Sequence, residues 1–309
     1  MTNVFKMRNR CLLVTNLTDS DATESPLSDV RRRFPFCEET RPESTRVEYL
    51  EKLAKKYANY ELVVGAGGGV AIDVAKYIGA SNGVEVIGFP TIISTDAMYT
   101  SSTAVREHGM VRYIPTKKPD EIILDFDLII QAPYRLNVAG WGDILSIHTA
   151  VWDWQLAAQR IGETYSTEVA GKALRLLDKA VRVDAKEGLM RLNECLQAEV
   201  ALCEEFGSAR PEEGSEHLFA YLIENYLPTN CPHGELVAVG ICELSKIQQN
   251  RVDFITGLMD RIGLKYRSED LGIDERIVKR VLKELPNYSK RHKFFYTVID
   301  EVDQQIGPT

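Results

Sequence analysis

The chain has 309 residues, of which 44% are hydrophobic and 27% are charged, and its formal net charge is −8 at pH 7. This length favours two domains over a single core, and the composition is that of an ordinary soluble globular protein. The negative charge argues against a nucleic-acid partner, because a phosphate backbone is bound through clustered lysine and arginine side chains. We find no signal-peptide pattern and no apolar stretch of the roughly 20 residues that a membrane span needs, so we expect a cytoplasmic protein with no membrane span.

The first part of the chain alternates short β-rich runs with helical stretches. Strands are predicted at residues 11–15, 62–65, 84–90, 111–114 and 122–125, the last two joined by a turn-rich segment. Helices are predicted at residues 44–57 and 70–78, whereas residues 16–28 are polar and predict a loop. Strands separated by helices are typical of βαβ units, so we expect a largely parallel sheet with ligands at the carboxyl ends of its strands.

From residue 133 onward the hydrophobic pattern is helical almost throughout. Helices are predicted at residues 143–160, 166–184, 187–206, 215–226, 234–250 and 274–284. This change of pattern predicts an α/β domain over residues 1–132 and an all-α domain over residues 133–309.

Six cysteines are scattered along the chain, and no two of them form a CxxC pair. They are Cys11, Cys37, Cys195, Cys203, Cys231 and Cys242. In a cytoplasmic protein this spacing predicts reduced thiols, and neither a disulfide framework nor a cysteine-based zinc site.

A glycine run, Gly65-Ala66-Gly67-Gly68-Gly69, closes the second predicted strand and precedes a helix. Glycines let a backbone approach a pyrophosphate closely, and a helix N-terminus adds free N–H groups and the positive end of its dipole. A tight turn without a ligand would use the same residues, so the run alone leaves both interpretations open. The run lacks the lysine of a Walker loop, and it follows the second predicted strand, whereas an ordinary Rossmann fingerprint follows the first.

One carboxylate and two histidines stand at the beginnings of three predicted helices of the second domain. Asp143 follows a glycine at the start of a strongly apolar helix. His217 comes two residues after Ser215, the predicted N-cap of its helix, and His233 opens the next helix. Each residue alone is more typical of a helix cap or a satisfied core histidine. Together they supply the ligand set of a catalytic zinc site with an open fourth position, and His148 is left out of this set as a weaker candidate.

Five ordered motifs run along most of the chain. They are Gly67-Gly68-Gly69-x-x-x-Asp73, Pro90-Thr91-x-x-Ser94-x-Asp96, Gly142-Asp143 with Thr149-Ala150-x-x-Asp153-Trp154, Gly214-Ser215-Glu216-His217, and His233-Gly234-Glu235. Together they resemble the sn-glycerol-1-phosphate dehydrogenases, which belong to the superfamily of iron-containing alcohol dehydrogenases, glycerol dehydrogenases and dehydroquinate synthases.

The resemblance implies a dehydroquinate synthase-like fold, in which an α/β Rossmann-like N-terminal domain binds the cofactor. The all-α C-terminal domain would bind the metal and the substrate, with a cleft between the two domains. Asp143, His217 and His233 would hold Zn²⁺, although the same ligands suit Fe²⁺ or Ni²⁺. A homodimer or a larger homo-oligomer is expected from the same resemblance.

The cofactor implied by the resemblance is NAD(H) or NADP(H). The residues expected to cradle its pyrophosphate are Gly67, Gly68, Gly69 and Asp73. The residues expected to line its nicotinamide are Thr91, Ser94 and Thr100. Asn16 follows the first strand, where an acidic residue would favour NAD, so its neutral side chain leaves NADPH open.

The resemblance also implies that Asp96 and Asp143 act in catalysis and bind the substrate, and that Tyr221 contacts the substrate beside them. Two residues depart from the family pattern. Tyr221 stands where a second histidine is usual, and Ile147 stands where a lysine is common; the first strand also begins unusually close to the start of the sequence. A tyrosine can donate a hydrogen bond but does not titrate near neutrality as histidine does.

The function implied is reduction of a small phosphorylated ketone, above all dihydroxyacetone phosphate to sn-glycerol 1-phosphate, by a metal-dependent NAD(P)H oxidoreductase. Three alternatives stay open. The first is an NAD-using sugar-phosphate cyclase of the dehydroquinate synthase type, which would consume no net NADH. The second is a reductase of another small aldehyde or ketone. The third is a degenerate ligand-binding scaffold, which neither zinc nor NADH would stabilise against heat.

Overall fold

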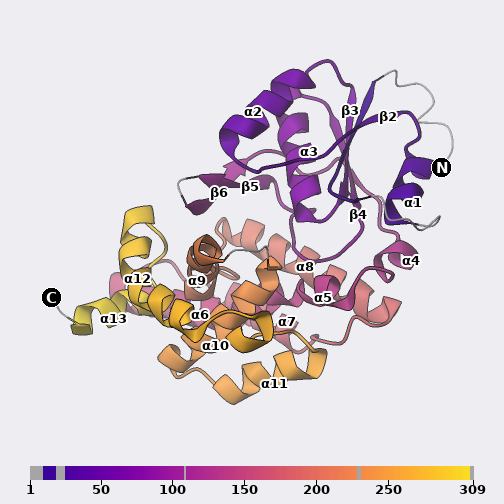
Figure 1. Cartoon of the computed structure of the whole chain (residues 1–309). Helices are drawn as coiled ribbons and strands as arrows, with labels where there is room; N and C mark the ends of the chain where they lie inside the picture. Colours follow the sequence, from indigo (N-terminus) through magenta and orange to yellow (C-terminus); the bar gives the residue numbers. More distant parts are fainter. Residues whose placement is uncertain (1–9, 19–24, 108, 228–230, 307–309) are drawn as a thin grey trace. The chain divides into compact units, whose positions relative to one another are not determined.

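The computed structural model describes residues 10–18, 25–107, 109–227 and 231–306, and the chain divides into two compact units, Met1–Pro133 and Tyr134–Thr309 (Figure 1). The first unit is α/β and the second is built of helices, as predicted for the fold class. Among the described residues, no helix is both long enough and apolar enough to cross a membrane.

A parallel sheet of five strands in the order β2-β1-β3-β4-β7 forms the centre of the first unit. Its strands are β1 Cys11–Thr15, β2 Cys37–Thr40, β3 Leu62–Gly67, β4 Glu85–Pro90 and β7 Glu121–Ile122. The helices are α1 Pro26–Arg33, α2 Val47–Lys56, α3 Gly69–Asn82 and the short α4 Phe126–Ile129. An antiparallel hairpin of β5 Ser102–Glu107 and β6 Met110–Pro115 forms a separate two-stranded sheet.

Both faces of the central sheet are buried, which explains why its strands are almost continuously apolar. In β1, Leu12 and Val14 join one core with Leu50 and Leu53 of α2. The intervening residue Leu13 joins a second core with side chains of α1. Helices on both faces are the mark of a doubly wound α/β unit.

The N-terminal prediction is wrong in its strand count. Helix α1 begins within residues 16–28, which were predicted as a loop, and the short strand β2 after it was not predicted. The strand predicted at 111–114 is part of β6, which pairs with β5, another strand that was not predicted. Of the strand predicted at 122–125 only Ile122 lies in the sheet, because Asp125 caps α4 by accepting from the backbone N–H groups of residues 127 and 128. Strand β2 is partly exposed and polar, so its pattern carries no apolar alternation to detect.

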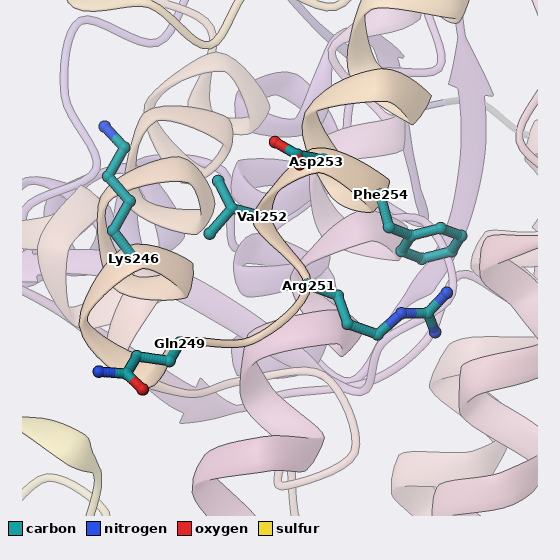
Figure 2. A pocket seen from close by; sticks show the side chains of 6 residues that line it. All are labelled: Lys246, Gln249, Arg251, Val252, Asp253 and Phe254. Carbon is teal, nitrogen blue, oxygen red and sulfur yellow. The ribbon is translucent and has the colours of Figure 1, made fainter.

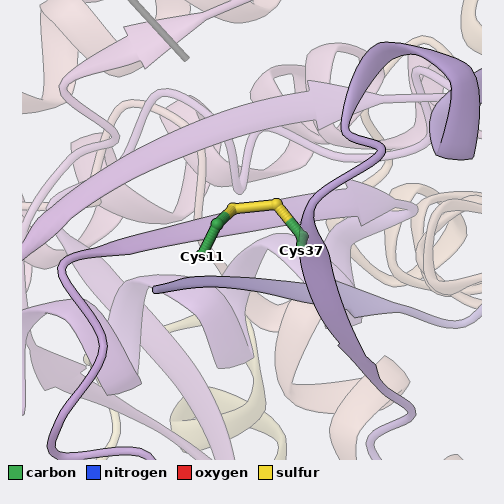
Figure 3. The surroundings of a disulfide bond; sticks show 2 residues. All are labelled: Cys11 and Cys37. Atoms are coloured by element: carbon green, nitrogen blue, oxygen red, sulfur yellow. A yellow bond between two sulfur atoms is a disulfide. The ribbon is translucent and has the colours of Figure 1, made fainter. Parts of the chain in front are cut away.

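The prediction that every cysteine is a reduced thiol is also wrong. Cys11 and Cys37 form a disulfide bond (Figure 3). They lie 26 residues apart in sequence but face each other in register on the adjacent parallel strands β1 and β2, with Cα atoms 4.4 Å apart. This spacing suits a disulfide. The pairing could not be predicted because β2 itself was missed.

The second unit consists of helices joined by short loops. They are α5 Tyr134–Val138, α6 Trp141–Ile161, α7 Thr167–Leu177, α8 Lys186–Phe206, α9 Ser215–Ile223, α10 His233–Gln248, α11 Val252–Ile262, α12 Glu275–His292 and α13 Val298–Ile306. Two short 3₁₀ turns, Glu224–Tyr226 and Ser268–Leu271, follow α9 and precede α12. Helices α5, α11 and α13 were not predicted. All the other helices overlap a predicted segment.

Candidate metal centre and cofactor site

Three helices of the second unit bring Asp143, His217 and His233 together. Asp143 lies in the first turn of α6, His217 in the first turn of α9, and His233 is the first residue of α10. One ligand atom from each lies within 4.8 Å of the others. Asp143 and His217 are almost fully buried, whereas the side chain of His233 is 22% exposed. The group therefore has a buried end and an accessible end.

Glycines allow these helices to approach closely enough. A Cβ atom on Gly142 would lie 2.4 Å from Cα of Gly234, and one on Gly234 would lie 1.8 Å from the carbonyl oxygen of Ala139. The starts of α6 and α10 are thus in backbone contact, which places Asp143 beside His233. Gly240 does the same between α10 and α9, because a Cβ there would lie 2.6 Å from a backbone oxygen of α9.

The imidazole of His217 has a carboxylate at each nitrogen. Nδ1 lies 3.0 Å from Oε1 of Glu216, and Nε2 lies 3.3 Å from Oε1 of Glu212. Burial, together with the charge of His233, lowers the pKa of His217 to about 3, so the ring is neutral, as a metal ligand must be. A carboxylate on the second ring nitrogen is the usual device that fixes the tautomer of a metal-binding histidine.

These donors fit a divalent cation. Two imidazoles and one carboxylate, with buried carboxylates behind them, form the donor set of a catalytic zinc site and suit iron or nickel as well. Burial raises the pKa of Glu216 to about 7, and its Oε1 accepts a hydrogen bond from the backbone N–H of Gly214 at 2.7 Å. The carboxyl group of Glu216 is thus held rigidly behind His217.

Asp153 fixes the start of α9. Its Oδ2 accepts hydrogen bonds from the backbone N–H and the hydroxyl of Ser215, at 2.9 and 2.5 Å, and its Oδ1 accepts from the backbone N–H of Val298. The predicted N-cap role of Ser215 is wrong, because α9 has Gly214 as its N-cap and Ser215 as its first helical residue. The hydroxyl of Ser215 ties α9 to α6 instead.

Tyr221 lies one helical turn after His217 and next to both histidines. Its ring is stacked on that of His233, with centroids 5.9 Å apart and planes at 10°, and it lies 5.9 Å from that of His217. Its hydroxyl donates to Oε1 of Glu213 at 2.5 Å. Burial raises the pKa of Glu213, which is 8% exposed. Glu212 and Glu213 were not predicted, although two acidic residues directly before Gly214-Ser215-Glu216-His217 are a visible signal.

Two other residues of α6 do not join the group. The side chain of Ile147 is fully buried, so the position where a lysine is common offers no charge. His148 lies with Nε2 2.8 Å from the backbone oxygen of Asn250, whose side-chain amide donates to the backbone oxygen of His148 in return. His148 therefore connects α6 to the α10–α11 loop.

In the first unit, the glycine run lies at the point where the strand order reverses. The order β2-β1-β3-β4 leaves a switch point between β1 and β3, the position where open α/β sheets bind nucleotides. Gly67 ends β3 with φ +147°, and a Cβ there would lie 2.1 Å from Oδ1 of Asn16, which follows β1. The N-terminus of α3 begins at Gly69. The run follows β3, the third strand of the chain, and not the second strand as predicted. Its place at the switch point, and not its order along the chain, is what it shares with other nucleotide-binding sheets.

Asp73 and Thr100 are linked through Lys76, a residue that was not singled out. Lys76 is fully buried, and its Nζ lies 2.9 Å from Oδ1 of Asp73, 2.7 Å from the backbone oxygen of Ala97 and 3.1 Å from Oγ1 of Thr100. Oδ2 of Asp73 accepts from the backbone N–H of Ala104 in β5. Asp73 thus holds the hairpin and the loop after β4 on α3.

The remaining predicted residues of the first unit lie in that loop. The backbone N–H of Thr91 donates to the backbone oxygen of Gly67 at 3.0 Å, and Thr91 is buried. Ser94 and Gly69 both line a small pocket at the start of α3. Asp96 is partly exposed in the same loop. The glycine run and the residues 91–100 therefore share one edge of the sheet.

A larger pocket of about 620 Å³ lies elsewhere in the second unit, at the end of α10 and the start of α11 (Figure 2). The residues that line it are Lys246, Gln249, Arg251, Val252, Asp253 and Phe254. The guanidinium of Arg251 lies over the ring of Phe254, 4.2 Å from its centroid. None of the predicted site residues lines this pocket, so the larger of the two pockets is not the candidate metal or cofactor site.

The class of protein follows from comparison with known families. A family model described as iron-containing alcohol dehydrogenase matches residues 4–133. Glycerol-1-phosphate dehydrogenase [NAD(P)+] of Sulfurisphaera tokodaii is 36% identical over 246 residues, covering 76% of this chain and 69% of the relative. The same enzyme of Aeropyrum pernix is 32% identical and covers 82% and 74% of the two chains. The chain belongs to the glycerol-1-phosphate dehydrogenase family, and the predicted resemblance is confirmed.

Solved structures share the fold at lower identity. A probable glycerol dehydrogenase from Sinorhizobium meliloti has a TM-score of 0.70 at 20% identity, covering 95% of this chain and 86% of the other. A 2-deoxy-scyllo-inosose synthase, solved with carbaglucose-6-phosphate, NAD⁺ and Co²⁺, has a TM-score of 0.64 at 18% identity and covers 90% and 80%. The predicted dehydroquinate synthase-like fold is confirmed.

Proposed function

We propose that the protein reduces dihydroxyacetone phosphate to sn-glycerol 1-phosphate with NADH or NADPH. The observation that carries this proposal is the convergence of Asp143, His217 and His233 from three helices, in a chain of the glycerol-1-phosphate dehydrogenase family. A divalent cation, when bound, supplies Lewis-acid polarisation of a carbonyl oxygen. The hydride chemistry belongs to the nicotinamide cofactor, so the protein contributes position and electrostatics.

We assign the cation to these three side chains and propose Zn²⁺, with Fe²⁺ or Ni²⁺ as substitutes. The neutral state of His217 and the carboxylate behind it support this assignment. Because His233 is partly exposed, the substrate oxygen approaches the cation from that side of the group.

Asp143 holds the cation, Asp96 of the first unit orients a substrate hydroxyl, and Tyr221 contacts the substrate beside the histidines. The hydrogen bond from Tyr221 to Glu213 supports such a role, because it fixes the phenol oxygen in one orientation and leaves its lone pairs as acceptors. A substrate hydroxyl is therefore the group that Tyr221 suits.

For the cofactor we propose that Gly67, Gly68 and Gly69 cradle the pyrophosphate at the N-terminus of α3, where backbone N–H groups and the helix dipole favour an anion. Asp73 acts on this site through Lys76, because a carboxylate facing a pyrophosphate directly would repel it. Lys76 connects Asp73 to Thr100. Together with Thr91 and Ser94, Thr100 forms the nicotinamide side.

The neutral side chain of Asn16, at the switch point beside Gly67, is compatible with both NADH and NADPH. The cytoplasm as compartment and a homodimer or larger homo-oligomer as assembly are further parts of the proposal. They rest on the resemblance to the family.

The test is turnover by the purified full chain with NADH and NADPH over a panel of phosphorylated and free ketones and aldehydes, with analysis of the bound metal. We expect stoichiometric NAD(P)H oxidation with dihydroxyacetone phosphate, loss of activity on chelation, and sn-glycerol 1-phosphate as product on chiral analysis. Turnover without net NAD(P)H consumption would favour the cyclase, and turnover of a metal-free H233A variant would refute the metal assignment.

A further inference from the structure

The hydroxyl group of Thr95 lies beside the first residue of α3. A Cβ atom on Gly69 would lie 2.8 Å from Oγ1 of Thr95, which is closer than real Cβ atoms approach another atom. The glycine therefore leaves room for this hydroxyl, and a larger residue at position 69 would have to displace it. Thr95 also lines the small pocket at the start of α3 together with Ser94 and Gly69. It was not among the predicted site residues, although both of its neighbours, Ser94 and Asp96, were.

The hydroxyl of Thr95 has one hydrogen bond made and one proton still to give. Its oxygen accepts from the backbone N–H of Ala97 at 3.3 Å, which closes a short turn. A hydroxyl that accepts in this way keeps its own proton for a second partner. Across the part of the chain that the structure describes, no acceptor takes that proton. Because Thr95 is partly exposed, a ligand can reach it.

The same place carries the first backbone N–H groups of α3. The N–H groups of residues 71 and 72 donate to the backbone oxygen of Gly68. The first N–H groups of a helix have no acceptor within the helix, and here these belong to Gly69 and Val70. Thr95 thus adds a side-chain donor to the N–H groups of a helix start, where the helix dipole also favours negative charge.

A buried lysine fixes the turn that carries Thr95. Nζ of Lys76 donates to the backbone oxygen of Ala97 at 2.7 Å, and the same ammonium group forms a buried ion pair with Asp73. The Cβ atom of Ala97 lies 3.5 Å from the position of a Cβ on Gly69, so the turn packs against the start of α3. The hydroxyl of Thr95 is therefore held in place before a ligand binds, which lowers the entropy cost of binding.

We propose that Thr95 is a further cofactor-binding residue, whose hydroxyl donates a hydrogen bond to an oxygen of the pyrophosphate at the start of α3. This inference rests on the proposed cofactor site at the glycine run. The ligand class that the hydroxyl recognises is a nucleoside diphosphate, because the group beside it is a cluster of donors suited to phosphate. Gly69 then serves the site twice, since it admits the pyrophosphate and makes space for the hydroxyl.

The experiment measures binding of NADH, ADP and adenosine to the purified full chain, by NADH fluorescence and its displacement, with no ketone present. T95V removes the hydroxyl and keeps the shape of the side chain, whereas T95S keeps the hydroxyl. The matched control is T103V in β5. The hydroxyl of Thr103 is bonded to the backbone oxygen of Asp73 and to the hydroxyl of Thr116, and not to the turn that carries Thr95.

We expect T95V to weaken binding of ADP and NADH by about 10- to 100-fold, the loss typical of a hydrogen bond to a charged group. Adenosine lacks phosphate, so its affinity should stay within about threefold of wild type in the same variant. T95S should retain the affinity for all three ligands within about threefold. T103V should do the same while lowering the melting temperature, and thermal unfolding verifies that each variant is folded.

Three results would overturn the inference. Unchanged ADP affinity in T95V would mean that the hydroxyl only closes the turn to Ala97. Equal losses of ADP and adenosine affinity, or an equal loss of ADP affinity in T95S, would mean that the loop is distorted and that no contact to phosphate is lost. A wild-type chain that binds neither NADH nor ADP would refute the proposed cofactor site as well. A chain that binds ADP through Thr95 but reduces no ketone would refute the reductase proposal alone.

Discussion

Substitution of Gly234 by alanine should separate two of the metal ligands without touching either. Gly234 follows His233 at the start of α10, and a Cβ at this position would lie 1.8 Å from the carbonyl oxygen of Ala139. Real Cβ atoms essentially never approach closer than 3.0 Å, so the two backbones must move apart by at least the difference, 1.2 Å. A metal centre tolerates ligand displacements of about 0.2 Å. His233 and Asp143 can then no longer hold one ion.

The magnitude follows from the same geometry. Overpacking a well-packed contact costs about 1–3 kcal/mol of stability, and losing one ligand or its support costs about 10- to 100-fold in metal affinity. We therefore expect G234A to lower the thermal stability of the metal-free protein and to weaken Zn²⁺ binding by at least tenfold. Chelator competition gives the affinity, and calorimetry with chelator present gives the stability.

The matched control is Gly257 in α11, where a Cβ would meet nothing within 4 Å. G257A should leave metal affinity unchanged and raise stability by up to about 1 kcal/mol, because alanine favours the helix over glycine. If G234A bound Zn²⁺ within threefold of wild type, the close contact between α6 and α10 would not be what assembles the site.

Three further predictions concern other contacts. Y221F keeps the ring stacked on His233 but leaves Glu213 without its donor; ketone turnover should fall while Zn²⁺ affinity stays within threefold, measured by steady-state kinetics and chelator competition. Burial raises the pKa of Asp153 to about 7 from its ordinary 3.8, and it raises the pKa of Glu216 to about 7 as well, so the folded state binds more protons and the free energy of unfolding should fall as pH rises from about 4 to about 7. D153N should reduce that slope in denaturant titrations, and Glu216 should supply the remainder. Reduction of the disulfide, or C37S, should lower the stability of the first unit by about 3 kcal/mol, measured in urea.

Each of these has an outcome that contradicts it. Equal turnover by Y221F would remove the tyrosine from the substrate side of the centre. An unchanged pH slope in D153N would place the titrating group elsewhere, and a control at the exposed Asp184 should keep the wild-type slope. Identical urea midpoints with and without reductant would mean that the disulfide does not constrain the unfolded chain.

Much of the candidate site was predictable because its residues stand at helix starts. Asp143, His217 and His233 each open a helix with a strong apolar pattern, and the glycine run joins a strand to a helix, so local pattern placed all of them. The sequence shows Glu212 as an acidic residue close to His217, but its contact with Nε2 of that ring was not predictable, because the contact depends on the turn that the hydroxyl of Ser146 holds. Lys76 was missed for a similar reason: within a helix, a lysine normally predicts an exposed side chain, and here the loop after β4 buries it.

The sequence by itself determined the division of the chain into an α/β part and a helical part, the buried strands β1, β3 and β4, and most of the helices of the second unit. It could do so because hydrophobic periodicity is a local property. Tertiary structure alone decided that β2 lies beside β1, so that Cys11 meets Cys37 and the glycine run falls at the switch point. It also decided that backbone contact at Gly142 and Gly234 brings two helix starts together. Such contacts depend on the packing of segments far apart in the chain, and no periodicity within either segment records them.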